Sequence, residues 1–183
     1  MEDGKRIYKG EGTISFVAYY PFARGVYKIG DNIPEEIKNT KEWIDASGLK
    51  SAVKDNYNSF SEGGSCNLYN AGDLSTDFKL IVNIENKPTN ITLKNNENQI
   101  IGSLNFSLAK QGSDTHVRFN SATQLIEGLI KSTDGEFELT GNLYNKYITD
   151  GDWFKIPIGE SIINIAETSH SDKPTIDYDY LYY

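Results

Sequence analysis

The sequence predicts a mainly β protein, folded as an antiparallel β-sandwich or jelly roll. Three observations favour this fold class. Apolar and polar residues alternate with a period of two in short runs along most of the chain. The chain contains 12 Tyr and 8 Phe, which fit the pleated surface of a sheet. Turn signals such as Asp134-Gly135 separate the runs, and most runs are not separated by the helical segments of about 10–15 residues that parallel strands would need.

The alternation predicts a series of strands in chain order. The longer ones are residues 13–20, 78–84, 100–108 and 174–183, and the shorter ones are residues 116–120, 124–130, 136–139, 154–156 and 162–166. In residues 100–108, Ile100, Leu104 and Phe106 are expected on one face. In residues 174–183, Tyr178 and Tyr182 are expected on one face, with hydroxyls that reach toward solvent or partners.

One segment departs from this pattern. Residues 34–58 are polar and weakly helical, with Pro34 at a helix start and Gly48 at its end, so they predict a short helical or irregular insertion. The insertion divides the chain into two parts. Residues 1–30 are expected to form an N-terminal arm or the last strand of a missing domain, and residues 31–183 the sandwich.

Composition argues against several function classes. The formal net charge is −8 with a pI of about 4.8, so the attraction that dominates nucleic-acid binding is missing. The chain has no apolar run of about 18 residues for a membrane span, and its first ten residues offer no apolar stretch for a signal peptide. We therefore expect a protein made and kept in a cytoplasm until it is released by some other route, without a nucleic-acid or membrane partner.

The residues that carry most enzyme chemistry are few and scattered. Cys66 is the single cysteine, which excludes an internal disulfide, and His116 and His170 lie too far apart for a zinc motif. Both histidines are expected on the surface. Neither a metal site nor a cofactor is expected, and no catalytic residue is assigned.

Carboxylates leave an enzymatic alternative open. Glu127, Glu136 and Glu138 lie near predicted strands, and a pair of carboxylates is what a glycosidase needs. Asp150 and Asp152 flank a glycine but lack the further oxygen ligands of a calcium loop, so a turn explains them. Because any acidic protein offers such pairs, we expect a protein that is not an enzyme.

Aromatic residues suggest a binding function instead. Trp43, Tyr144 and Trp153 are candidates for stacking on the apolar face of a sugar ring, which would make the domain a carbohydrate-binding module. The alternative for each is packing in the core, which is favoured for Trp153 beside Phe154.

Three blocks of sequence together resemble the distal tail protein of long-tailed (siphovirus-type) bacteriophages, in its C-terminal domain. The first block is residues 10–13 (GEGT), which run into Phe16 and residues 20–23 (YPFA). The second is residues 69–73 (YNAGD) with residues 76–78 (TDF), and the third is residues 153–160 (WFKIPIGE) before the Tyr-rich end. The blocks occur in the expected order.

The resemblance implies a galectin-like sandwich with a structural function in the virion. Such a domain projects from the hub between the tail tube and the baseplate, and it docks tail-tip or receptor-binding proteins; in some members it binds cell-surface glycans. From the resemblance we expect the family's ring-forming N-terminal domain to be missing from this sequence except for its last strand. We therefore expect a hexamer for the full-length protein and a monomer for this chain.

Overall fold

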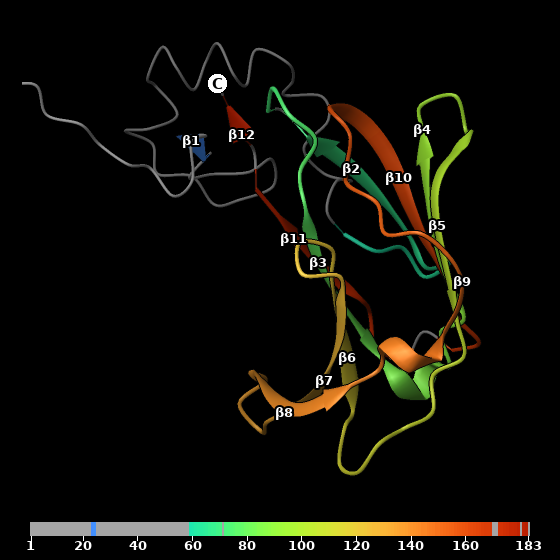
Figure 1. Cartoon of the computed structure of the whole chain (residues 1–183), viewed down its shortest axis with the longest axis vertical. Helices are drawn as coiled ribbons and strands as arrows, with labels where there is room; N and C mark the ends of the chain where they lie inside the picture. Colours follow the sequence, from blue (N-terminus) through green and yellow to red (C-terminus); the bar gives the residue numbers. More distant parts are fainter. Residues whose placement is uncertain (1–22, 25–58, 71, 170–171, 180, 183) are drawn as a thin grey trace, which may run out of the picture.

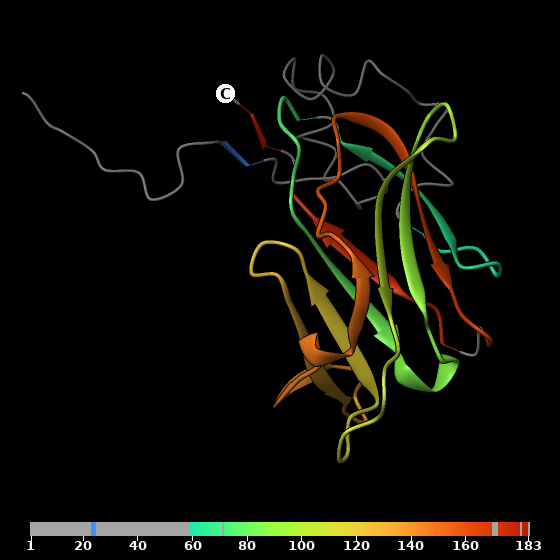
Figure 2. The same ribbon diagram turned by 45° about the vertical axis from the view of Figure 1, so that its right-hand side comes forward.

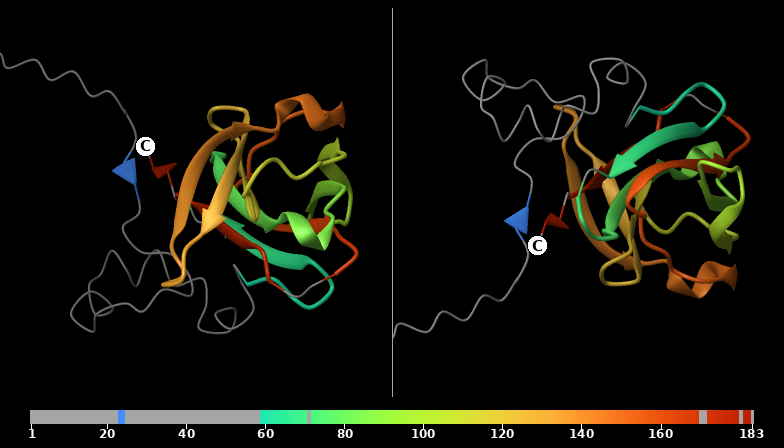
Figure 3. Two further views of the ribbon diagram at one scale, coloured as in Figure 1. Left: turned by 90° about the horizontal axis from the view of Figure 1, so that it is seen from below. Right: turned by 90° about the horizontal axis from the view of Figure 1, so that it is seen from above.

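The computed structural model describes residues 23–24, 59–70, 72–169, 172–179 and 181–182. They form two five-stranded antiparallel sheets and one separate pair of short strands (Figure 1). The two sheets pack face to face, as the turned and end-on views show (Figures 2 and 3). The predicted antiparallel β-sandwich is confirmed.

Strands distant in sequence lie side by side in both sheets. The first sheet has the order β2 (Ser65–Asn70), β10 (Gly159–Ala166), β4 (Asn90–Asn95), β5 (Ile100–Phe106) and β9 (Ile148–Gly151). The second has the order β11 (Thr175–Tyr178), β3 (Phe78–Asn83), β6 (His116–Asn120), β7 (Leu125–Lys131) and β8 (Phe137–Leu143). Two short 3-10 helices, η1 (Ile84–Asn86) and η2 (Asn145–Tyr147), lie in connections, and β1 (Ala23–Arg24) pairs with β12 (Leu181–Tyr182).

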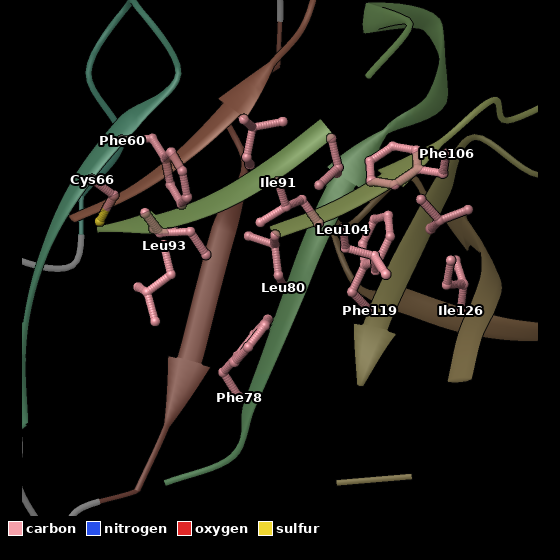
Figure 4. Packing of buried hydrophobic residues seen from close by; sticks show 14 of the residues in the cluster. Phe60, Cys66, Phe78, Leu80, Ile91, Leu93, Leu104, Phe106, Phe119 and Ile126 are labelled. Atoms are coloured by element: carbon pink, nitrogen blue, oxygen red, sulfur yellow. The ribbon is translucent and has the colours of Figure 1, made fainter. Parts of the chain in front are cut away.

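The core lies between the two sheets and is built by the alternation seen in the sequence. On β3, Phe78, Leu80 and Val82 are buried, whereas Lys79 between them is exposed. Rings from both sheets meet across the interior, and the centroids of Phe106 and Phe119 are 4.9 Å apart (Figure 4). Burial of each such side chain contributes about 1.5–3 kcal/mol, which is the main stabilisation of the sandwich.

Several predicted strands are confirmed with small shifts at their ends, and others are corrected. Residues 154–156 form no strand, and Ile156 makes only a single bridge with Thr76. Ile100 does not share the buried face of Leu104 and Phe106. It is 61% exposed, because the register between β4 and β5 shifts at Leu93 and places it at the hairpin end.

The C-terminal run is also different from the prediction. Residues 174–183 divide into β11 and β12, and Tyr178 is buried rather than directed to solvent. Its hydroxyl donates to the carbonyl oxygen of Tyr69 (3.1 Å) and accepts from the amide of the same residue (3.2 Å). The predicted strand at residues 13–20, the insertion at residues 34–58 and Trp43 lie outside the described residues. Of the predicted arm at residues 1–30, only β1 is described.

Candidate functional site

The second and third sequence blocks meet at one end of the sandwich through the side chain of Asn70. Its Nδ2 donates to the carbonyl oxygens of Leu74 (2.7 Å) and Ile156 (3.4 Å), and its Oδ1 accepts from the amide of Gly72 (3.0 Å). Asn70 is fully buried, so these bonds replace the water that its amide would otherwise bind. The turn after β2 is thereby fixed beside the segment that precedes β10.

The same turn holds the C-terminal strand. The amide of Asp73 donates to the carbonyl oxygen of Leu181 on β12 (2.7 Å). Gly72 permits this approach, since a Cβ atom there would lie 2.5 Å from the oxygen and 2.6 Å from the nitrogen of Leu181. Because β1 pairs with β12, strands from both parts of the chain are fastened at this end (Figure 1). We call the turn, Ile156 and β12 the junction.

A pocket of about 270 Å³ opens beside the junction, where β3, β6 and β11 end or begin. Aromatic rings and polar groups both line it. The lining residues are Thr76, Asp77, Phe78, Lys79, Asn120, Ala122, Asp177, Tyr178 and Asp179. Among the described residues of the lining, three are aspartates and one is a lysine.

Asp77 is held in place at the pocket wall by two donors. Ser121 Oγ donates to Oδ1 of Asp77 (3.2 Å) and Lys155 Nζ donates to Oδ2 (3.1 Å). Ser121 Oγ itself accepts from the amide of Phe78 (2.8 Å), which connects β3 to the chain that follows β6. These hydrogen bonds therefore fix the orientation of the Asp77 side chain in the pocket wall.

Asn120 is the unusual residue of the pocket. It lies opposite Lys79 in the β3–β6 register and is only 8% exposed. Its Oδ1 is buried and accepts no hydrogen bond within the described part of the chain. An unpaired buried acceptor costs about 1–3 kcal/mol, so this oxygen lowers the stability of the fold locally.

The three predicted stacking aromatics do not form one platform. Tyr144 is fully buried, which corrects its assignment as a glycan-stacking residue. Its hydroxyl donates to Oδ2 of Asp114 (2.7 Å) and accepts from the amide of Gln111 (2.9 Å), so the ring is fixed inside the sandwich. Trp153 is half-buried and packs against the core with part of its side chain still accessible.

His116 also differs from the prediction, because it is buried rather than on the surface. It is 5% exposed and its ring nitrogens contact Thr115 Oγ1 and Asp172 Oδ2, each at 2.9 Å. Burial by itself would raise the pKa of Asp172, but the hydrogen bond from His116 and the ammonium of Lys131 lower it below its ordinary value. These contacts give His116 a structural explanation. His170 lies outside the described residues.

Two of the other groups considered for chemistry are accounted for by packing or pairing. Cys66 is buried in the core, and Glu127 forms an ion pair with Arg118 (2.9 Å). Glu136, Glu138, Asp150 and Asp152 are exposed. Within the described ranges, no three His, Cys, Asp or Glu side chains converge in a way that would hold a metal ion. No helix in these ranges is long and apolar enough to cross a bilayer.

Of the residues that line the pocket, the sequence analysis singled out residues 76–78, as part of a block that resembles the family, and Tyr178. Its other walls come from residues 120–122 and 177–179, which only the strand pairing brings together. Comparison with known proteins finds no matching family model, no similar curated protein and no similar solved structure.

Proposed function

We propose that this chain is a non-catalytic structural domain of a bacteriophage tail, of the distal tail protein type, that projects from the tail hub and docks other tail proteins. One observation carries the proposal. Two of the three blocks that resemble the family, together with the Tyr-rich C-terminal run, converge on the junction through Asn70, Gly72 and Ile156. Motifs that are separate in the sequence thus contact one another and together hold the junction.

The architecture of the junction supports this function. β1 belongs to the part of the chain that resembles the end of the family's ring domain, and it pairs with β12 at the junction. A sandwich connected in this way is attached at one end, and its opposite end and open faces remain for partners. The partners we propose are tube, tail-tip or receptor-binding proteins, with a hexamer for the full-length protein and a monomer for this chain.

The proposal is tested by locating the protein in phage particles. Antibodies raised against the purified chain are applied to particles induced from the source bacterium and viewed by electron microscopy with gold labelling. We expect gold at the tip of the tail, where tube and baseplate meet. Gold on the capsid, or particles whose protein mass spectrum lacks this chain, would overturn the proposal.

A carbohydrate-binding function is the second candidate, and the partial exposure of Trp153 favours it. Asp152, the preceding residue in the chain, is exposed, and a sugar site combines an aromatic ring with such polar groups. Binding to a glycan array that is lost in Trp153→Ala would support this function. Binding to no glycan, or binding unchanged by the substitution, would refute it.

A further inference from the structure

β8 is an open edge of the second sheet. It is the last strand in the sheet order, and within the described part of the chain no further strand pairs with it. The strand pairs connect Leu139, through β7 and β6, with Asn83, the last residue of β3. This edge therefore lies at the end of the sandwich away from the junction (Figure 1). A strand in such a position presents backbone N–H and C=O groups that another strand can pair with.

Two residues of β8 direct their backbone groups to the open side. The amide of Ser132 donates to the carbonyl oxygen of Glu136 (2.9 Å), so Glu136 bonds toward β7. In an antiparallel ladder such residues alternate with residues whose N–H and C=O point the other way. The carbonyl oxygen of Leu129, opposite Leu139, likewise accepts from the chain that enters β6 (2.9 Å) and not from β8. Phe137 and Leu139 thus offer two donors and two acceptors to an added strand.

The side chains along this edge divide between an apolar face and an acidic face. Phe137 is half-buried and Leu139 is 56% exposed on one face. Glu138 is exposed on the other face, together with Glu136 just before the strand. Within the described ranges, neither of these two carboxylates forms an ion pair. The edge therefore specifies both faces of a strand that would pair with it.

Charge decides which kind of strand fits. Asp134 in the β7–β8 turn is exposed and adds to the negative charge of Glu136 and Glu138. The cation at the end of β7, Lys131, is already paired with Asp172 (3.2 Å). Opposite charges directly across a strand pair stabilise it, and like charges destabilise it. The complementary strand therefore alternates basic residues with apolar ones.

A second copy of this chain fits the edge less well. The antiparallel self-pairing that would join the two apolar faces sets Phe137 opposite Leu139 of the other copy, and it places Glu138 directly against Glu138. Pairing further along is limited by the register shift between β7 and β8 and by Gly141, whose φ is 84°. Such irregularities bend a strand, so residues 136–140 are the part that can accept a partner.

We propose that β8 binds an extended segment of a partner protein, in which basic and apolar residues alternate, as an added antiparallel strand. The proposal rests on the proposed docking function only in the source of this segment. The complementarity of the edge is a property of its own residues.

The test is a titration of the ¹⁵N-labelled full chain, followed by two-dimensional NMR, with the peptide N-acetyl-Lys-Val-Lys-Val-Lys-amide. In the expected register its valines lie opposite Phe137 and Leu139, and its central lysine opposite Glu138. We expect saturable shifts at residues 136–140, with a dissociation constant on the order of millimolar, because ordering a short flexible peptide offsets most of the gain.

Two modified peptides are the first controls. N-acetyl-Lys-Lys-Val-Val-Lys-amide has the same composition without the alternation. The original peptide with N-methyl groups on both valines keeps its charges and side chains but loses the donors that would reach the edge. Each is expected to bind several-fold more weakly.

Substitutions in the chain locate the binding. Glu138→Lys should weaken the basic peptide several-fold and strengthen binding of N-acetyl-Glu-Val-Glu-Val-Glu-amide, whereas Leu139→Thr should weaken both peptides. Glu97→Lys and Ile100→Thr make the same changes at exposed positions of the β4–β5 hairpin and serve as matched controls. Because Glu138 and Leu139 are exposed, both variants should keep the fold, which an unchanged spectrum away from β8 would show.

Several results would overturn the assignment. They are equal binding of the alternating and rearranged peptides, binding unaffected by N-methylation, shifts confined to other parts of the chain, or equal effects of Glu138→Lys and Glu97→Lys. If no peptide binds saturably, the acidic residues serve only to protect the edge from pairing. A dimer that forms through residues 136–140 without peptide would assign the edge to a second copy instead. Peptide binding by a chain that is absent from phage particles would leave the edge assignment standing and overturn the tail function.

Discussion

The buried hydrogen bonds of Tyr144 give the sharpest stability prediction. Its hydroxyl donates to the carboxylate of Asp114 (2.7 Å), which Asn142 Nδ2 also contacts at 3.0 Å and 3.1 Å, and it accepts from the amide of Gln111 (2.9 Å). Both Tyr144 and Asp114 are fully buried. The change Tyr144→Phe removes one oxygen and leaves the ring, so it isolates these two bonds.

The expected loss follows from the charge of one partner. A hydrogen bond to a charged group is worth about 1.5–3 kcal/mol, and the amide of Gln111 is left without its acceptor. We therefore expect the free energy of unfolding to fall by about 2–3 kcal/mol. The measurement is urea denaturation monitored by circular dichroism, with an unchanged slope showing that the variant unfolds from the same compact state.

Tyr147→Phe is the matched control. Its ring centroid is 5.7 Å from that of Tyr144, it is only half-buried, and its hydroxyl makes no hydrogen bond with described residues in this structure. Its free energy of unfolding should change by no more than about 0.5 kcal/mol. Equal losses in the two variants would refute the assignment of the stabilisation to the Asp114–Tyr144 bond. So would an unreduced effect of Tyr144→Phe in an Asp114→Asn background.

Three further predictions concern titration and close packing. Burial, and then the hydrogen bond to its carboxylate partner, raise the pKa of Tyr144. Its contribution to the free energy of unfolding is therefore complete below about pH 10 and falls above that pH, where the tyrosine of the unfolded chain ionises. An identical loss of stability at alkaline pH in wild type and Tyr144→Phe would contradict this. The pKa of Asp172 is lowered by its histidine and lysine partners, so its contribution is present at neutral pH and disappears as the pH falls below about 4. Asp172→Asn should therefore be less stable than wild type at pH 7 and equal to it in acid, in urea titrations at both values. A Cβ atom at Gly102 would lie 2.5 Å from Cγ of Phe154, so Gly102→Ala should cost about 1–3 kcal/mol by overpacking; Gly63→Ala, with its nearest atom at 3.9 Å, should be close to neutral, and similar melting temperatures for both would argue against the clash.

The fold class could be predicted because alternation dominates the strands that face the core. Residues 116–120 combine a β-branched and an aromatic residue at alternate positions, and β6 has these bounds in the structure. The prediction missed β4 although Ile91 and Leu93 alternate with polar residues there and are buried, whereas two other missed strands lack such a signal. β2 follows a glycine-rich stretch and carries only Cys66, Leu68 and Tyr69 as apolar residues, and β9 has four residues that end in Gly151.

The candidate site could not be predicted, because it depends on register between distant strands. Lys79 lies opposite Asn120 on one side and Asp177 on the other, and these pairings juxtapose residues that are 41 and 98 positions apart. Nothing in the sequence distinguishes Asn120 from an asparagine in a turn. The burial of Tyr144 and His116 was likewise invisible, since each is buried by partners that the fold supplies, Asp114 and Asp172.

The pairing of β1 with β12 has a mechanical consequence. Ala23 lies opposite Tyr182 and Arg24 opposite Leu181, so Ala23 and Tyr182 are at the same end of the pair. A pulling force applied at these two residues would open the bonds of the antiparallel pair one after another instead of loading them all at once. The bond from Asp73 to Leu181 would take the load next, before any strand of the two large sheets. Tension would therefore separate β1 from β12 at low force while leaving the core of the sandwich folded.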